Sequence, residues 1–340
     1  MKADKVTRKT PAFLPAFPED APRDRLGLAQ WLLSPEHPLT MRVTVNRFWQ
    51  QLFGTGIVKT SEDFGLQGEW PSHPELLDWL AVNFRETGYD VKALMRLMVT
   101  SATYRQANIA SHELFRRDPE NRLLARGPRF RLDAEMLRDQ ALSLAGLLVK
   151  KIGGPGVKPP QPDGLWFAVG YSGSNTVRFK KDEGKDKVHR RSLYTFWKRT
   201  SPPPQMNTFD APSREACSVR RERTNTPLQA LMMMNDPQYL EAARGLATRM
   251  ICEGGDTPAD RVRFAFELAT SRTPAGHEAK NLLSAFGDYL KEYQANPDAA
   301  QDVINIGELP PDKDLDPSEL AAWMMVANVI LNLDEVINKG

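Results

Sequence analysis

Arginines crowd into one stretch of this 340-residue chain and define its first candidate site. Residues 190–223 contain eight cations and three acids, although the whole chain carries a formal net charge of +2. Seven of these cations are arginines, whose planar guanidinium suits bidentate contacts with carboxylate, phosphate or sulfate. We call residues 190–223 the arginine-rich segment. We expect it either to bind an anion or to satisfy buried carboxylates and carbonyls of the fold, as structural ion-pair networks do.

Paired carboxylates offer a second kind of chemistry. Glu135 and Asp139 are four residues apart in a predicted helix, so their side chains face the same way. Such a pair could act as general acid and base. The alternative is ordinary ion pairing with nearby arginines such as Arg131 and Arg138, and the spacing favours this second interpretation.

Metal and cofactor chemistry finds little support in the sequence. The five histidines are scattered, and none has a histidine four residues away or a cysteine beside it. Cys217 and Cys252 are too few for a zinc site or a disulfide framework, and no CxxCH motif could attach haem covalently. The two cysteines could form one bridge or stay as buried thiols. We therefore expect no metal and no cofactor in this chain.

Composition excludes several classes of partner. The near-neutral charge argues against a nucleic-acid-binding protein, which would carry a strongly basic face. No apolar run reaches the length that spans a membrane. The N-terminal residues are charged and rich in proline, and they lack the apolar core of a signal peptide. We expect a soluble protein without a signal peptide in this chain.

Helical periodicity dominates the elements that must position these residues. We predict a mainly α-helical fold in which a central irregular insertion, rich in proline and glycine, carries at most a short β-hairpin. The expected plan is an extended leader (1–21), an N-terminal helical half (22–150), an irregular arginine-rich insertion (151–225) and a C-terminal helical half packed on the first (226–340). The segments NTVRF (175–179) and RRSLYTFW (190–197) carry the β-branched and aromatic residues expected of short strands.

Helix starts are marked by Asp or Thr followed by Pro. This pattern predicts helices from Pro119, Pro227, Pro237, Pro258, Pro274 and Pro317. Ser72 and Glu75 resemble a capping box. The run LQALMMM (228–234) is apolar almost all round, which is typical of a buried helix, and residues 299–316 have the composition of a polar linker.

Several long motifs together resemble a planctomycete-specific domain of unknown function. The resemblance extends from about Pro22 to Ile337 and rests on these stretches: VNRFWQQLFGTGIVKTSEDFG, WPSHPELLDWLAVNF, LMVTSATYRQ, DPENRLLARGPRFRLDAEMLRDQAL, RRSLYTFWKRT, FDAPSR and RTNTPLQALMMMNDP. Such domains lie toward the C-terminus of large exported proteins, after a cytochrome c domain. The resemblance implies a periplasmic or extracellular location, haem only in an upstream domain, and other domains of a longer polypeptide as partners.

The predicted function is a non-catalytic binding or interaction module of such a protein, with an anionic, polysaccharide-like ligand. The candidate ligand-binding residues, drawn from the arginine-rich segment and from the family motifs, are Arg47, His73, Arg191, Arg199, Asp210, Arg214, Arg220, Arg221 and Arg223.

Two other functions remain open at this point. One is a polysaccharide hydrolase in which carboxylates such as Asp63, Glu135 or Asp210 serve as acid and base. The other is a structural scaffold that docks a haem domain. A deep pocket with a carboxylate of raised pKa favours the enzyme, an arginine-lined surface favours binding, and a large apolar patch favours docking.

Overall fold

The fold is mainly α-helical, as predicted. The computed structural model describes residues 9–170, 173 and 177–340, and these residues form two compact units. The first unit runs to Arg129 and includes Gly340, and the second comprises Phe130–Lys339.

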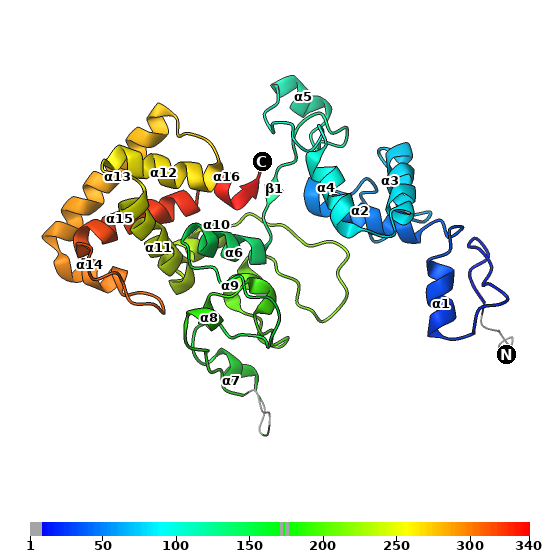
Figure 1. Cartoon of the computed structure of the whole chain (residues 1–340), viewed down its shortest axis with the longest axis horizontal. Helices are drawn as coiled ribbons and strands as arrows, with labels where there is room; N and C mark the ends of the chain where they lie inside the picture. Colours follow the sequence, from blue (N-terminus) through cyan, green and yellow to red (C-terminus); the bar gives the residue numbers. More distant parts are fainter. Residues whose placement is uncertain (1–8, 171–172, 174–176) are drawn as a thin grey trace. The chain divides into compact units, whose positions relative to one another are not determined.

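The first unit contains five helices among its described residues (Figure 1). They are α1 (Arg25–Leu32), α2 (Thr40–Phe53), α3 (Pro74–Glu86), α4 (Val91–Thr100) and α5 (His112–Arg117).

The second unit contains eleven α-helices, one 3₁₀ helix and one two-stranded sheet within its described part (Figure 1). They are β1 (Phe130–Arg131), α6 (Ala134–Leu144), α7 (Leu165–Val169), α8 (Lys185–Val188), η1 (Ser192–Tyr194), α9 (Pro204–Thr208), α10 (Pro227–Asn235), α11 (Pro237–Glu253), α12 (Pro258–Thr270), α13 (Gly276–Ala295), α14 (Pro297–Ile304), α15 (Pro317–Leu331), α16 (Asp334–Ile337) and β2 (Asn338–Lys339).

The sheet lies elsewhere than the sequence predicted. β1 and β2 pair antiparallel, with Phe130 opposite Lys339, so the two ends of the second unit meet. The insertion instead carries short helices and two isolated parallel bridges, Val149 with Arg190 and Val157 with Thr195. The stretch 190–197 pairs at single residues because η1 interrupts it. The first two residues of the predicted strand 175–179 lie outside the described residues.

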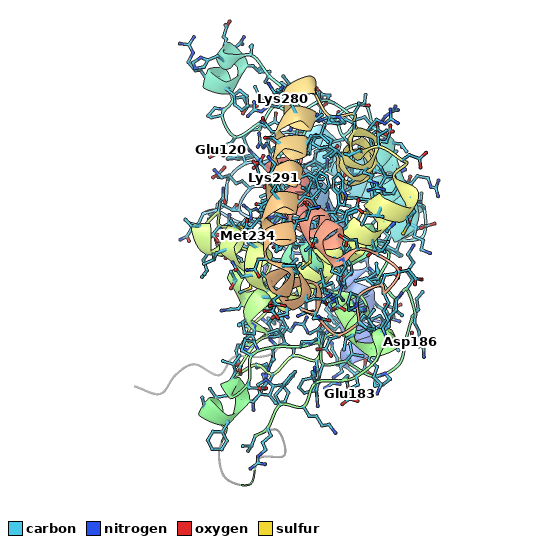
Figure 2. All side chains as sticks on the ribbon, turned by 90° about the vertical axis from the view of Figure 1, so that its left-hand side faces the viewer. Glu120, Glu183, Asp186, Met234, Lys280 and Lys291 are labelled. Atoms are coloured by element: carbon cyan, nitrogen blue, oxygen red, sulfur yellow. The ribbon has the colours of Figure 1, made fainter. Side chains whose placement is uncertain are left out.

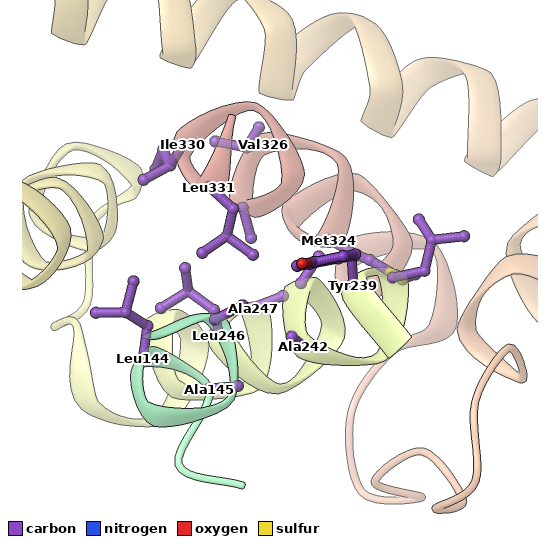
Figure 3. Close-up of a cluster of buried hydrophobic side chains, with 14 of the residues drawn as sticks. Leu144, Ala145, Tyr239, Ala242, Leu246, Ala247, Met324, Val326, Ile330 and Leu331 are labelled. Atoms are coloured by element: carbon purple, nitrogen blue, oxygen red, sulfur yellow. The ribbon is translucent and has the colours of Figure 1, made fainter. Parts of the chain in front are cut away.

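Helix α15 is the centre of the second unit. Its sequence is apolar on nearly every face, and α11, α13 and α14 pack around it. Alanines 321, 322 and 327 are fully buried, and short side chains at such positions allow neighbouring backbones to approach closely. Figure 3 shows the cluster of apolar side chains that α6, α11 and α15 share.

Two close contacts lock the helices around α15. The rings of Phe286 on α13 and Trp323 on α15 stack with centroids 3.9 Å apart. On the other side α6 meets α11 at Gly245, where an added Cβ would lie 2.9 Å from the Cβ of Ala145. Only a glycine allows this approach, so α6 is held firmly against the core.

Residues after α14 are held by a buried charge cluster rather than forming the predicted linker 299–316. Residues 297–304 are helix α14, which packs on α15. Arg244 then donates to the carbonyl oxygens of Ile304, Ile306 and Leu309, while Glu241 accepts from the N–H of Leu309 and lies 3.0 Å from His189 Nε2.

The first unit is organised by polar side chains that bind backbone. Asn46 is fully buried on α2 and pairs with both the N–H and the carbonyl of Val58. Arg122 donates to the carbonyls of Gly56 and Ile57. These bonds fix the glycine-containing loop after α2, where Gly54 has φ +82°.

One predicted helix start and one predicted helix cap in the first unit are wrong, although α3 itself forms where it was predicted. Asp118 begins no helix, because its carboxylate binds the N–H groups of Arg122 and Leu123 and closes a loop instead. Ser72 does not cap α3. His73 occupies the N-cap position without a capping bond, and the Ser72 hydroxyl donates to the carbonyl of Ile57.

Helix starts in the second unit follow the sequence more closely. Helices α10, α11, α12 and α15 begin at their prolines as predicted, and α13 begins two residues after Pro274. Helix α10, however, is not buried all round. Its Leu228, Leu231 and Met234 are more than half exposed on one face (Met234 in Figure 2), because the helix covers the unit from outside.

Charged side chains line the outer face of α13, where Figure 2 shows Lys280 and Lys291. Among the helices of the described chain, none combines the length and the apolar character that crossing a membrane requires.

Replacing Trp323 by alanine tests the central position of α15. We expect Trp323→Ala to lower the free energy of unfolding by about 3–5 kcal/mol, because it removes a fully buried ring and leaves a cavity beside Phe286. Trp79→Ala is the matched control, since Trp79 is 53% exposed on α3, and it should change stability by about 0.5 kcal/mol or less. Denaturant titration measures both, and equal effects would contradict the account.

Arg272 joins three helix ends and makes stability depend on pH. It binds Glu278 and Glu335 through several contacts of 2.7–3.1 Å, and the hydrogen bond from Arg272 lowers the pKa of Glu278 to about 2. A depressed carboxyl pKa stabilises the fold above the ordinary value, and this contribution is lost as pH falls toward 2.

Because these groups are partly exposed, we expect Arg272→Ala to cost about 1 kcal/mol at pH 7. The difference from wild type should shrink between pH 4.5 and 2. Denaturant titration at several pH values measures it, and a pH-independent difference would show that packing, not charge, accounts for the loss.

Candidate functional site

The arginine-rich segment folds against the first turn of α6. Glu135 accepts two hydrogen bonds from Arg221, at 2.6 and 3.2 Å. Asp133, which precedes the helix, lies 3.6 Å from Arg221 and 3.7 Å from Arg223. Because both carboxylate side chains are at least four-fifths buried, they need cationic partners. The segment therefore neutralises the start of α6.

In the ion pair of Glu135 with Arg221, mutual attraction outweighs burial in setting both pKa values. Burial raises the pKa of Glu135, but the hydrogen bond and charge of Arg221 outweigh burial, so the pKa lies below its ordinary value. Arg214 adds a smaller effect in the same direction, which places its charge near Glu135. Burial lowers the pKa of Arg221, and its bond to Glu135 raises the pKa above the ordinary value. The pair is ionised at neutral pH.

Further along α6, Asp139 holds the opening of the segment. Its carboxylate accepts from the N–H of Ser192 at 2.7 Å and lies 3.7 Å from Arg191 Nε. Glu135 and Asp139 thus face the same way, as their spacing requires, and each has its own arginine. Ion pairing of these two carboxylates is confirmed, but the partners differ from those expected, because Arg221 and Arg191 come from the arginine-rich segment. Of the two predicted arginines, Arg138 lies 4.0 Å from Asp139.

A second group of polar contacts closes the far end of the segment. The carboxylate of Asp210 accepts from both the N–H and the hydroxyl of Thr224. Gln229 of α10 donates to Thr224 and to the carbonyl of Thr208, and it accepts from Arg131. These contacts tie both ends of the loop 210–224 to α10.

Sequence reasoning missed the role of Arg138. This residue is 2% exposed, and its guanidinium donates to Gln238 Oε1, to the carbonyls of Val188 and Arg190, and to Ser192 Oγ. It thereby fixes the chain where the arginine-rich segment begins. The signal was present, because Arg138 lies four residues after Ala134 and three before Ala141, within the apolar face of α6.

The outer part of the segment gathers around Trp197. The indole N–H of Trp197 donates to the carbonyl of Ser213, and the guanidinium of Arg214 lies over the indole ring, 4.5 Å from its centroid. Arg199 Nε is 3.9 Å from Glu215. Residues 197–199 and 213–215 therefore lie side by side. Arg199 and Arg214 remain exposed, unlike Arg221 and Arg223, which are half-buried.

Three candidate residues remain: Arg220, Arg47 and His73. Arg220 is exposed, and its carbonyl accepts from Ser218 Oγ. Arg47 is exposed on α2 and His73 is half-buried before α3, both in the first unit. A single site that joins them to the arginine-rich segment stays a prediction.

The structure corrects one interpretation of the two cysteines. Cys217 and Cys252 are both exposed and unbridged, so the interpretation of buried thiols is wrong. Across the described residues, histidine, cysteine and carboxylate side chains form no group of three that could hold a metal ion.

These features define a helical protein with an ion-paired arginine loop mounted on its core. The chain belongs to the PSD1 family of proteins of unknown function (DUF1553), whose family model matches residues 24–286. The match ends inside α13, whereas the helix at the centre of the core, α15, follows it. No curated protein matches the chain, and no solved structure does so either.

Removing the central ion pair should loosen the segment. We expect Arg221→Met to lower the free energy of unfolding by about 1–2 kcal/mol at pH 7, because it leaves a largely buried carboxylate without its partner. Since the pKa of Glu135 is depressed in the folded state, the stabilisation exists above pH 4.5 and fades below it.

Arg199→Met provides the control, because Arg199 is 63% exposed and distant from its carboxylate. It should cost about 0.5 kcal/mol or less. Denaturant titration of both variants decides the matter, and equal losses would mean that the Glu135 pair does not hold the segment.

Proposed function

We propose that this chain is a non-catalytic binding module that recognises an anionic ligand at the exposed cations around Trp197. The proposal rests on one observation: the arginines of the arginine-rich segment fall into two groups with different surroundings. Arg221 and Arg223 face largely buried carboxylates at the start of α6. Arg199 and Arg214 are exposed: Arg214 lies over the ring of Trp197, and Arg199 Nε lies 3.9 Å from the exposed carboxylate of Glu215. The inner arginines hold the loop, and the outer ones present positive charge to solvent.

The stacking of Arg214 on Trp197 suits anion recognition. An indole face fixes the plane of a guanidinium while leaving its N–H edge available for an oxyanion. Arg214 also has φ +64°, a left-handed backbone that costs an arginine roughly 1 kcal/mol. Local strain of this kind is concentrated at functional sites. Holding Arg214 in this backbone conformation therefore costs the loop some stability.

The carboxylates favour binding over hydrolysis. A general acid requires a raised pKa, whereas Arg221 holds the pKa of Glu135 low. Asp210 is engaged by Thr224, and the carboxylate of Asp63, in the first unit, accepts from the N–H of Gly65. Each carboxylate of the hydrolase hypothesis therefore has a local structural task.

The ligand we infer is an acidic polysaccharide bearing sulfate or carboxylate groups. Sulfate and carboxylate match the guanidinium, and an aromatic ring beside the charge suits the flat face of a sugar. The family resemblance supports an exported setting, in which the module joins other domains of a longer polypeptide, including a cytochrome c domain. Haem then belongs to the upstream domain.

Binding to oligosaccharides tests the proposal. Isothermal titration calorimetry should detect a salt-sensitive affinity of the purified chain for sulfated or uronate oligosaccharides. Arg214→Ala should weaken it about tenfold, the loss expected from one charge-assisted hydrogen bond. Arg263→Ala removes another exposed arginine, on α12, and should leave affinity unchanged. Wild-type affinity in both Arg214→Ala and Arg199→Ala would refute the proposal.

A further inference from the structure

Glu215 puts a negative charge among the exposed arginines around Trp197. Its carboxylate lies 3.9 Å from Arg199 Nε, and in the sequence it follows Arg214, which stacks on Trp197. The side chains of Arg199 and Glu215 are 63% and 57% exposed, so a ligand in solution can reach both. We call Trp197, Arg199, Arg214 and Glu215 the Trp197 surface. This surface, proposed above for an anionic ligand, contains an anion of its own.

A tight turn fixes the position of Glu215. The carbonyl of Ser213 accepts from the indole N–H of Trp197, and the backbone N–H of Glu215 donates to Ser213 Oγ at 3.3 Å. A serine hydroxyl that binds the N–H two residues later closes such a turn. The backbone of Arg214, between these two residues, has φ +64°. The turn therefore holds the carboxylate of Glu215 opposite Arg199.

The contact between Arg199 and Glu215 leaves both groups able to bind a ligand. At 3.9 Å it is longer than a hydrogen bond, and an ion pair between exposed groups contributes little to stability. The inner pair is different, because Arg221 donates to the largely buried Glu135 at 2.6 Å. A ligand can therefore bind Arg199 and Glu215 without breaking a strong bond of the fold.

Charge selects the kind of anion that suits the Trp197 surface. Two guanidiniums and one carboxylate leave a single net positive charge, which balances one anionic group of a ligand. A second sulfate or phosphate close to the first would approach the carboxylate of Glu215, and like charges at short range repel each other. A carboxylate accepts hydrogen bonds and donates none, so Glu215 suits a neighbouring hydroxyl of the ligand.

We propose that Glu215 is a specificity-determining residue of the Trp197 surface, which selects sugars with one carboxylate per ring and free hydroxyl groups. The ligand carboxylate accepts hydrogen bonds from Arg199 and Arg214, and a sugar hydroxyl donates to Glu215. This inference rests on the function proposed above and narrows its ligand from acidic polysaccharides in general to uronates. Densely sulfated sugars are disfavoured.

Calorimetry with three ligands tests this assignment: tetragalacturonate, the same tetramer with its hydroxyl groups methylated, and sucrose octasulfate. The wild-type chain should bind tetragalacturonate about tenfold more tightly than the methylated tetramer, the ratio expected from one hydrogen bond to a charged group. Glu215→Gln removes the charge but keeps the shape of the side chain. It should reduce this ratio to about threefold and strengthen octasulfate binding about tenfold, because the repulsion is lost.

Glu222→Gln is the matched control, because Glu222 is an exposed acid of the same segment and its loss changes the net charge equally. It should leave the ratio and the octasulfate affinity at their wild-type values. A Glu215→Gln variant that keeps both wild-type values would overturn the inference. Equal changes in the two variants would overturn it as well, since they would reflect net charge alone.

The inference and the proposed function fail in different ways. If Arg214→Ala weakens binding of all three ligands while Glu215→Gln changes none, the Trp197 surface stands and the role of Glu215 is overturned. If Arg199→Ala and Arg214→Ala both bind tetragalacturonate as wild type does, the proposed function fails, and the role of Glu215 fails with it.

Discussion

Pairing of buried charge at helix α6 is the constraint on which the second unit depends. The inner face of α6 packs on α11 so closely that Gly245 cannot carry a side chain. At the start of α6, Asp133 and Glu135 lie largely out of water, and further along the helix Arg138 is almost completely buried. Carboxylates in such places require cations, and a buried guanidinium requires acceptors. The arginine-rich segment supplies both, through its arginines and through the carbonyls near its start.

This arrangement makes the arginine-rich segment an extension of the core. Arg138 and Asp139 fix the chain at residues 188–192, Glu135 and Asp133 fix it at Arg221 and Arg223, and Gln229 fixes its exit into α10. Between these points the chain is free to present side chains outward. The inner arginines therefore serve the fold, and the proposed ligand binding is assigned to the exposed ones, Arg199 and Arg214.

Local signals in the sequence predicted the helices well where capping chemistry decides them. Four helices of the second unit have the caps that the sequence predicts. They are capped by a capping box of Thr226 and Gln229, and by Asp236, Thr257 and Asp316. Asp118 and Ser72 carry similar signals but bind other backbone groups, because loops distant in sequence supply competing partners.

Tertiary contacts determine the features that could not be predicted from the sequence. The pairing of β1 with β2 joins residues about two hundred positions apart, so no local pattern marks it. Helix α10 looks buried from its composition, yet its surroundings leave one face open. The arginine-rich segment could be identified as a candidate site from charge, whereas the partition into inner and outer arginines depends on which carboxylates α6 brings close.

Hydrogen exchange followed by mass spectrometry tests the central claim most directly, in wild type and in Glu135→Gln. If the first turn of α6 holds the arginine-rich segment, peptides that cover residues 209–226 should exchange about tenfold faster in the variant, a change of roughly 1.4 kcal/mol in local opening. Peptides of α15 should keep their wild-type protection. Unchanged exchange at 209–226, or a loss that extends equally to α15, would contradict the account.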